Sequence, residues 1–289
     1  MAASRVLGTA LLIVAVTLAA PAFAHDLPLG DGKVSTSPRE GYVFSCQTRF
    51  PSNAPGAQRS GAWLDAAAST WDPDLKPIID GSVTWPSEIS IGIEDDKRVV
   101  HGNNLPNHPT GTFPVSRSDD AYQYDRNPNS IRAQDVLLRL PLEPKVAAGA
   151  TCLPMGMIGF TLTGAALFNA LDAGGRDAPA HELQDACNGH PERQGQYHYH
   201  DYSDCMTDTQ SGPRGHSDLV GYALDGFGIY GLYEASGVMV HDDDLDACHG
   251  HVGDVVWDGE VVSLYHYHFT EEYPYSLGCF TGEVTLKRR

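Results

Sequence analysis

The sequence predicts a mainly β fold, a β-rich α+β domain tied by disulfides, with an internal duplication and few short helices. Three observations support this prediction. Short apolar segments alternate with polar residues and are separated by Gly, Pro and Asp. The 289-residue chain contains six cysteines. Two long segments also repeat the same motifs in the same order.

Strand patterns precede the repeated part. Residues 89–93 alternate Ile with Ser or Gly, which predicts a half-buried strand. Residues 136–138, Val-Leu-Leu, predict a buried strand that Pro141 ends. Residues 103–114 have the composition of a loop.

The duplication relates residues 159–205 (repeat A) to residues 221–279 (repeat B). Each repeat opens with a Gly-containing strand pattern, continues to Asp-Ala-Cys-x-Gly-His, reaches Tyr-His-Tyr-His and ends at another cysteine. We expect each repeat to contain two strands joined by a turn, then a short helix that ends at the first cysteine and is capped by Gly189 or Gly250. Asp258-Gly259 in repeat B predicts a two-residue hairpin turn.

The duplication also selects one disulfide pairing. Cys187–Cys205 and Cys248–Cys279 are the equivalent pairs, and Cys46–Cys152 is left to tie the N-terminal part to the start of repeat A. A zinc site with cysteine ligands is the competing interpretation. It is weaker, because no two cysteines have the Cys-x-x-Cys spacing.

The first 24 residues have the features of a secretory signal peptide. Arg5 precedes an apolar stretch, and Ala22-Phe23-Ala24 fits cleavage after Ala24. The stretch is too short for a membrane span, so we expect a secreted or periplasmic protein with no integral membrane association. The formal net charge of −18 disfavours a nucleic-acid partner and favours cations.

The expected organisation has three parts. They are a signal peptide at residues 1–24, an irregular extension rich in Pro, Ser, Gly and Ala at residues 25–70, and a domain at residues 71–289. The domain begins with a β-rich lead-in, residues 71–158, which precedes repeats A and B.

The Tyr-His-Tyr-His segments are candidate metal sites. Side chains alternate along a strand, so both imidazoles share one face, about 7 Å apart at Cα. Two such imidazoles can bind one ion with bonds of about 2.0–2.1 Å. If the repeats face each other, the imidazoles converge on one site; two separate sites, one per repeat, are the alternative. The candidate ligands are His198, His200, His266 and His268, with His190 and His251 as further ligands or as partners of ligands.

Carboxylates and a further histidine are expected to support these imidazoles. Asp185 and Asp246 precede the histidines in equivalent places and are candidates to orient them. In a metal-free interpretation, the same carboxylates would be the hydrogen-bond partners of the histidines. His108 lies in a predicted loop, either completing the site from outside the repeats or serving as an ordinary loop residue.

One carboxylate distinguishes the repeats. Asp225 stands in repeat B where Thr163 stands in repeat A, and it is the candidate catalytic residue, as ligand, orienting group or general base. Alternatively, Asp225 only forms a turn with Gly226. As a minor alternative, cleavage after Ala24 would let His25 bind copper through its amine and imidazole.

These motifs resemble the YHYH family of secreted, mostly bacterial proteins. The strongest matches are Gly-Tyr-Ala-Leu-Asp-Gly-Phe-Gly-Ile-Tyr-Gly at 221–231, Leu-Asp-Ala-Cys-His-Gly-His at 245–251 and Tyr-His-Tyr-His at 265–268. Asn-His-Pro-Thr-Gly at 107–111 and Tyr-Pro-Tyr at 273–275 with Cys279 extend the resemblance over roughly residues 80–282. The resemblance implies kinship and no assigned reaction, so function must be argued from the residues.

Three functions fit the sequence. The first is binding of a transition metal ion, copper, zinc or iron, by paired His-x-His strands. The second is an extracellular metalloenzyme, a hydrolase or a copper or iron oxidase, in which the protein leaves one coordination position open. The third is a metal-free module that binds a carbohydrate or a surface partner through exposed Trp and Tyr.

Overall fold

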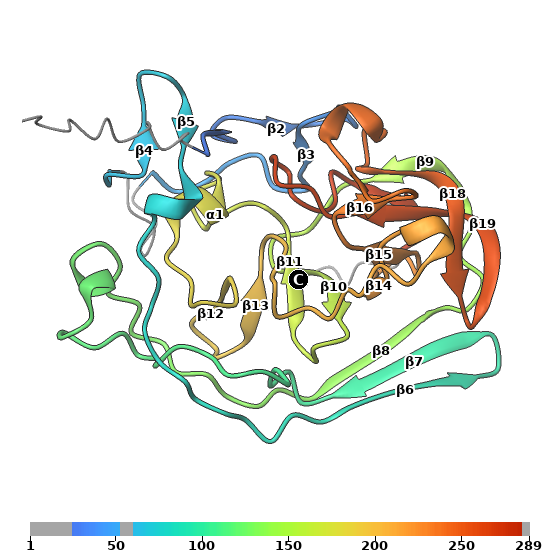
Figure 1. Ribbon diagram of the computed structural model, residues 1–289, viewed down its shortest axis with the longest axis horizontal. Coiled ribbons are helices and arrows are strands. Elements are labelled where there is room, and N and C mark those ends of the chain that lie inside the picture. The colour runs from blue at the N-terminus through green and yellow to red at the C-terminus, as the bar shows by residue number, and fades with distance from the viewer. Residues whose placement is uncertain (1–24, 53–59, 285–289) are drawn as a thin grey trace, which may run out of the picture.

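The structure is a computed structural model that describes residues 25–52 and 60–284. The expected signal peptide, residues 1–24, lies outside the described residues. The predicted mainly β fold is confirmed: among the described residues, one short α-helix, α1 (Ala178–His181), accompanies many strands (Figure 1). No helix in the described part of the chain has the length and apolar character needed to cross a membrane.

An eight-stranded sheet forms the centre of the fold, in the order β12-β13-β11-β10-β14-β15-β19-β18. In each half, an antiparallel pair is followed by a parallel pair and then by another antiparallel pair. The halves meet where β10 and β14 pair antiparallel. The strands are β10 (Met157–Thr161), β11 (Ala166–Phe168), β12 (Gly189–Pro191), β13 (Tyr197–Tyr199), β14 (Leu219–Ala223), β15 (Gly228–Tyr230), β18 (Gly250–Trp257) and β19 (Glu260–His268).

The two halves of the sheet share one pairing pattern. The first half uses strands of the segment named repeat A, apart from the start of β10, and the second half uses strands of the segment named repeat B, apart from the start of β14. Within each half, the Tyr-His-Tyr-His strand pairs in parallel with the strand that follows the first turn. Each repeat therefore folds as its own four-stranded unit.

A separate three-stranded antiparallel sheet contains β6 (Ile89–Glu94), β7 (Lys97–Gly102) and β8 (Val136–Pro141). The two strands predicted in this region are present, and β8 ends at Pro141 as expected. The predicted burial is wrong in part, because Ile93 is 59% exposed and Leu137 58% exposed. β6 is an edge strand, so its apolar side chains are covered on one side only.

Short elements make up the rest of the described chain. In residues 25–52 and 60–71 the strands are all two residues long, and Cys46–Cys152 ties this segment to the central domain. The elements are β1 (Leu27–Pro28), β2 (Val34–Ser35), β3 (Val43–Phe44), β4 (Leu64–Asp65), β5 (Thr70–Trp71), β9 (Val146–Thr151), β16 (Tyr233–Glu234), β17 (Val238–Met239) and β20 (Phe280–Gly282), with 3-10 turns η1 (Pro73–Leu75), η2 (Asp120–Gln123), η3 (Pro213–Gly215) and η4 (Asp242–Asp244).

Each repeat contains one disulfide, and the three pairs are those expected from the sequence: Cys46–Cys152, Cys187–Cys205 and Cys248–Cys279. The predicted hairpin is also present. β18 and β19 pair along their full length around Asp258 and Gly259, whose φ angles of 50° and 85° suit a tight two-residue turn.

The helix expected before each cysteine is wrong. Asp185 and Asp246 each accept the backbone N–H groups of the following Cys and Gly, which closes a tight turn in place of a helix end. Gly189 and Gly250 therefore begin strands and cap no helix. The residues before them take the left-handed conformation instead, with φ of 56° at Asn188 and 72° at His249.

These two glycines are required for packing. A Cβ atom on Gly189 would lie 2.1 Å from Cζ of Tyr197, and one on Gly250 would lie 2.5 Å from Oη of Tyr265. The tyrosine ring of the neighbouring strand crosses over the glycine in both repeats. In both repeats, therefore, the position after the left-handed residue has no room for a side chain.

We predict that Gly189→Ala destabilises the protein by about 2–3 kcal/mol, because the ring of Tyr197 is buried and has no room to move aside. Urea unfolding measures this change. Gly92→Ala in β6 is the matched control, since a Cβ there meets nothing within 4 Å. Equal stability of the two variants would contradict the packing of Tyr197 on Gly189.

Candidate metal centres

Nine residues, seven histidines and two glutamates, fall into two groups. Cluster A contains His190, His198 and His200 with Glu182, and cluster B contains His216, His251, His266 and His268 with Glu234. In cluster A the ligand atoms of the three histidines all lie within 4.8 Å of one another, and the same holds for His216, Glu234, His266 and His268. The clusters are therefore compact enough to surround one ion each.

The strands aim these side chains. His198 and His266 stand on the Tyr-His-Tyr-His strands β13 and β19, where alternation places the imidazoles on one face and the phenols on the other. His190 lies directly across from His198, and His251 directly across from His266. The cross-strand pairs thus repeat in both halves of the sheet.

The expected convergence of both His-x-His pairs on one site is wrong. β13 and β19 are five strand positions apart in the sheet, a separation of roughly 24 Å at the usual strand spacing. The physical reason is that each Tyr-His-Tyr-His strand pairs inside its own repeat, while the repeats meet at β10 and β14. The alternative of one cluster per repeat matches the arrangement.

The backbone fixes which nitrogen of each ring faces the cluster. Nδ1 of His198 lies 3.1 Å from the carbonyl of Gln196, and Nδ1 of His266 lies 3.0 Å from that of Leu264. Three further rings direct Nδ1 to a carbonyl in the same way: His200 at Asn169, His268 at Gly231 and His216 at Ser217. A carbonyl only accepts, so Nδ1 carries the proton and Nε2 presents a lone pair to the cluster.

The Nε2 atoms approach one another closely. In cluster A, Nε2 of His198 lies 3.1 Å from Nε2 of His200, and Glu182 Oε2 lies 3.2 Å from His200 Nε2 and 3.3 Å from His190 Nε2. Lone pairs that face each other at such distances repel unless a proton or a metal ion lies between them. The arrangement is suited to a shared cation.

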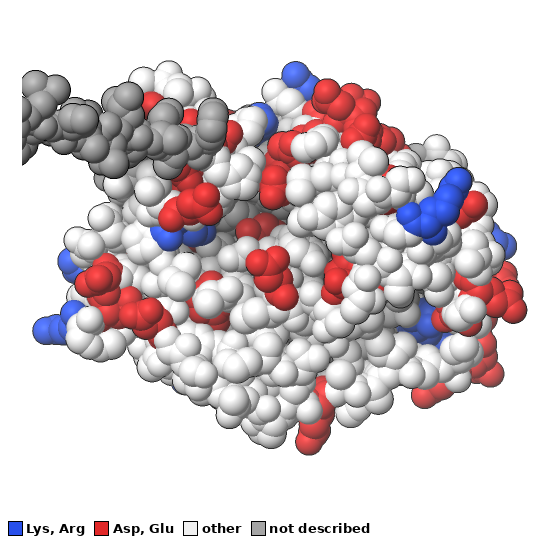
Figure 2. Space-filling model, viewed as in Figure 1, with Lys and Arg blue, Asp and Glu red and all other residues white. Residues whose placement is uncertain are grey.

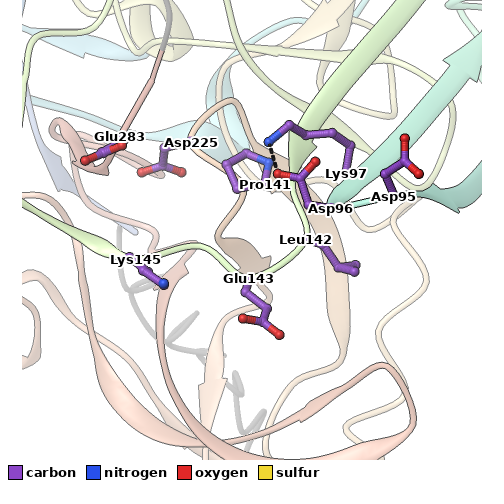
Figure 3. Close-up of a pocket in the computed structure, with 9 residues that line it drawn as sticks. All are labelled: Asp95, Asp96, Lys97, Pro141, Leu142, Glu143, Lys145, Asp225 and Glu283. Carbon is purple, nitrogen blue, oxygen red and sulfur yellow. Dashed lines mark hydrogen bonds and ion pairs between the residues drawn. The ribbon is translucent and has the colours of Figure 1, made fainter.

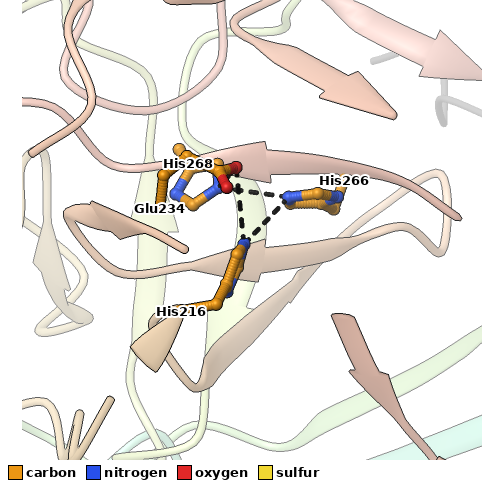
Figure 4. A group of neighbouring side chains, drawn as sticks. All are labelled: His216, Glu234, His266 and His268. Atoms are coloured by element: carbon orange, nitrogen blue, oxygen red, sulfur yellow. Dashed lines mark hydrogen bonds and ion pairs between the residues drawn. The ribbon is translucent and has the colours of Figure 1, made fainter. Parts of the chain in front are cut away.

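Cluster B has the same core with one more group, His216 (Figure 4). Nε2 of His266 lies 3.1 Å from Nε2 of His268 and 3.3 Å from Nε2 of His216, and Glu234 points its carboxylate at them. Glu234 Oε1 lies 3.5 Å from Nε2 of His268 and 2.7 Å from Nε2 of His251. A tetrahedral ion with bonds of about 2.05 Å holds its ligand atoms about 3.3 Å apart, which agrees with these spacings.

Burial keeps most cluster B groups in the charge states that bind cations. Burial lowers the pKa of His266 to about 2, and burial also lowers the pKa of His216 and His251. The pKa of Glu234 is held below its ordinary value, first by its contact with His268. Cluster B therefore combines neutral imidazoles with an ionised carboxylate.

Cluster A differs in its electrostatics. Burial strongly lowers the pKa of His198, whereas the neighbouring carboxylate of Glu182 raises the pKa of His190 against the effect of burial. The pKa of Glu182 is lowered well below its ordinary value by His190 and His200, although burial opposes this. Glu182 is therefore ionised, and its carboxylate stabilises positive charge on the neighbouring imidazole of His190.

Three residues of the clusters were not predicted from the sequence. The sequence pattern assigns no partner to His216, and it predicts no role for Glu182 or Glu234. The duplication gives no signal for them. Glu182 directly follows α1 as its C-cap residue, whereas Glu234 lies in the separate β16–β17 ribbon. Only the three-dimensional arrangement brings them to the histidines.

The carboxylates expected beside the histidines lie on the tyrosine face instead. Tyr197 donates to Asp185 and Tyr265 donates to Asp246, at 3.0–3.1 Å to the nearer oxygen. His108 also lies on this face, where its Nε2 contacts the hydroxyl of Tyr199. Alternation along the strand separates these groups from the imidazoles, so their expected support of the site is wrong.

Asp225 is also on the tyrosine face. It is fully buried, accepts a 2.6 Å hydrogen bond from the hydroxyl of Tyr267, and receives the backbone N–H of Gly282. Thr163 meets Tyr199 in the same way in repeat A, at 2.9 Å. The expected contact of Asp225 with imidazoles is thus wrong, and the turn that it forms before Gly226 is present.

One pocket among the described residues is lined by none of the cluster residues (Figure 3). It has a volume of about 600 Å³ and is lined mostly by charged side chains, Asp95, Asp96, Lys97, Glu143, Lys145, Asp225 and Glu283, with Pro141 and Leu142. No imidazole lines it. Its wall of mixed charge gives no reason to place the histidine chemistry there.

Two minor expectations can be compared with the structure. His25 is partly exposed and lies 3.4 Å from Glu271, away from the residues of clusters A and B. The four Trp and thirteen Tyr, all within the described residues, are buried or partly exposed, and Trp85 and Tyr233 are among the partly exposed ones.

We predict that Tyr267→Phe costs about 2–3 kcal/mol of stability, because the buried carboxylate of Asp225 loses a strong donor. Tyr199→Phe, whose hydroxyl meets Thr163 and the ring of His108 but no carboxylate, is the matched variant and should cost about 1 kcal/mol. Chemical denaturation measures both. Shifted imidazole NMR signals from cluster B in Tyr267→Phe would contradict the separation of the two faces.

The chain was compared with known proteins. The family model described as YHYH protein matches residues 137–240. The match includes the first Tyr-His-Tyr-His segment and ends before the second, so it is shorter than the resemblance read from the motifs. No curated protein and no solved structure matches the chain.

Proposed function

We propose that this YHYH-family protein binds transition metal ions, one in cluster A and one in cluster B. The proposal rests on one observation: five imidazoles place Nδ1 against a backbone carbonyl and direct Nε2 into a cluster. Metal-binding histidines have this arrangement, since the hydrogen bond at one nitrogen fixes the tautomer and orientation of the other. Its occurrence in both repeats adds weight.

The ligand types favour zinc, copper or iron. Imidazole nitrogens suit these ions, and one carboxylate in each cluster shifts the preference toward zinc and iron. Calcium and magnesium prefer oxygen ligands and are disfavoured. The acidic surface also attracts cations in general (Figure 2), as the net charge of −18 implies.

A metal-free charge network is the second candidate, and one observation favours it in cluster A. The carboxylate of Glu182 raises the pKa of His190, so an imidazolium paired with Glu182 would satisfy these two residues without a metal ion. It also requires a proton between the Nε2 atoms of His198 and His200, which lie 3.1 Å apart. Metal analysis separates the two candidates for each cluster independently.

We expect full-length protein, purified without a metal-affinity tag, to hold two transition metal ions per chain. The double variant His198→Ala/His200→Ala should lose one equivalent and His266→Ala/His268→Ala the other, because each pair supplies two Nε2 ligands to one cluster. Elemental analysis by mass spectrometry after dialysis measures the metal content.

His101→Ala is the matched control, since this histidine is exposed and lies on β7, outside both clusters. It should retain both ions. Unchanged metal content in the two double variants, with normal folding by circular dichroism, would sink the proposal.

A further inference from the structure

The two clusters differ in how far solvent reaches them. In cluster A the side chains of His190 and His200 are 6% and 3% exposed, and that of Glu182 is 14% exposed. In cluster B the side chains of His251 and Glu234 are 26% and 29% exposed, while those of His216 and His268 are buried. Cluster B therefore has one side, at His251 and Glu234, where the side chains reach solvent, although Oε1 of Glu234 itself is buried.

An aromatic ring closes cluster A more tightly than cluster B. Phe168 stacks face to face on His198, with ring centroids 3.9 Å apart and an interplanar angle of 22°. The equivalent residue in repeat B, Tyr230, meets His266 with its edge at 5.0 Å, and its hydroxyl donates to the carbonyl of Val256. The ring of Tyr230 is thus held at the β18 backbone and packs edge-on against the buried His266 without stacking on it.

A glycine leaves room on the open side of cluster B. Gly253 follows His251 by two residues on β18, so both lie on the same face of the strand. A Cβ atom there would lie 3.2 Å from Cε1 of His266, 3.9 Å from Nε2 of His251 and 4.0 Å from Oε1 of Glu234. Gly253 has no left-handed φ, so backbone conformation does not require a glycine there.

The position that corresponds to Gly253 in repeat A carries a side chain. His190 is followed two residues later by Glu192, so the side-chain-free position is present only in repeat B. The space beside Gly253 faces three potential ligand residues of cluster B and lies on the side that solvent reaches. A small molecule entering there would approach a cluster B metal ion directly.

We propose that cluster B keeps one coordination position of its metal for a small anionic ligand, which enters over Gly253, whereas cluster A encloses its ion. This inference rests on the proposed function. A divalent ion bound by neutral imidazoles and one carboxylate keeps a net positive charge, which favours an anion with an oxygen or nitrogen donor atom. Partial exposure and an open position are the properties of reactive metal sites, in contrast to closed structural ones.

The test uses the full-length protein loaded with cobalt(II), whose visible absorption reports its coordination, and sodium azide as the anion. We expect azide to change the absorption of one cobalt per chain and to saturate. His198→Ala/His200→Ala should keep this response, because it removes only cluster A. His266→Ala/His268→Ala should lose the response while the cobalt of cluster A remains.

Gly253→Val tests the entry route. Its side chain should fill the space next to His266 and His251 and weaken azide binding by roughly tenfold or more, with the cobalt content unchanged. Gly253→Ala gives a smaller effect in the same direction and serves if the valine variant folds poorly. Gly92→Val in β6, where a side chain meets open space, is the control and should bind azide normally.

The outcomes distinguish the two proposals. Absence of bound cobalt would overturn the metal-binding proposal and this inference together. Two bound cobalt ions with no response to azide, or a response that survives only in cluster A, would overturn the inference alone. Normal azide affinity in both Gly253 variants would overturn the entry route.

Discussion

The hydrogen bond from imidazole Nδ1 to a backbone carbonyl is the interaction on which both clusters depend. Without it, a buried histidine is free to turn either nitrogen inward, and the rings would relieve the mutual repulsion of their lone pairs. His200 is held by the carbonyl of Asn169 and His268 by that of Gly231. Each of these carbonyls belongs to the residue that directly follows a strand, β11 or β15. The parallel pairing of these strands with β13 and β19 therefore sets the orientation of the rings.

The tyrosine face anchors the same strands from the other side. Tyr199 and Tyr267 are fully buried, and their hydroxyls find partners in Thr163 and Asp225. Buried phenols with satisfied hydroxyls resist rotation and sliding of the strand. In this division of roles, the phenols fix the strand register and leave the imidazoles on the opposite face for cation chemistry.

Much of the local structure was predictable because it depends on short-range rules. Alternation along the strand correctly assigned the imidazoles and phenols to opposite faces, and Asp258-Gly259 correctly gave a hairpin turn. The placement of Asp225 was not predictable in this way, because both a turn and a contact with imidazoles fit its sequence position. Only its hydrogen bond to Tyr267 decides between them.

Long-range arrangement was less predictable. Sequence equivalence of the two His-x-His pairs carries no information on their distance, which strand order sets through the pairing of β10 with β14. His216 and Glu234 were not predicted as cluster residues for a related reason. They come from segments without a counterpart at the same spacing in repeat A. Periodicity identifies the face of a strand, whereas the neighbours of that face depend on the whole topology.

The seam between the halves of the central sheet has a geometric consequence. Phe160 pairs with Tyr222, and the flanking pairs are Gly159 with Ala223 and Thr161 with Gly221. In the alignment of the repeats, Gly159 corresponds to Gly221 and Phe160 to Tyr222, so a local two-fold axis passes through the central pair. The contact has the self-complementary geometry of an isologous interface, formed here within one chain. Separating the two halves would leave β10 and β14 as open edge strands, whose unpaired backbone groups are a template for pairing with another chain.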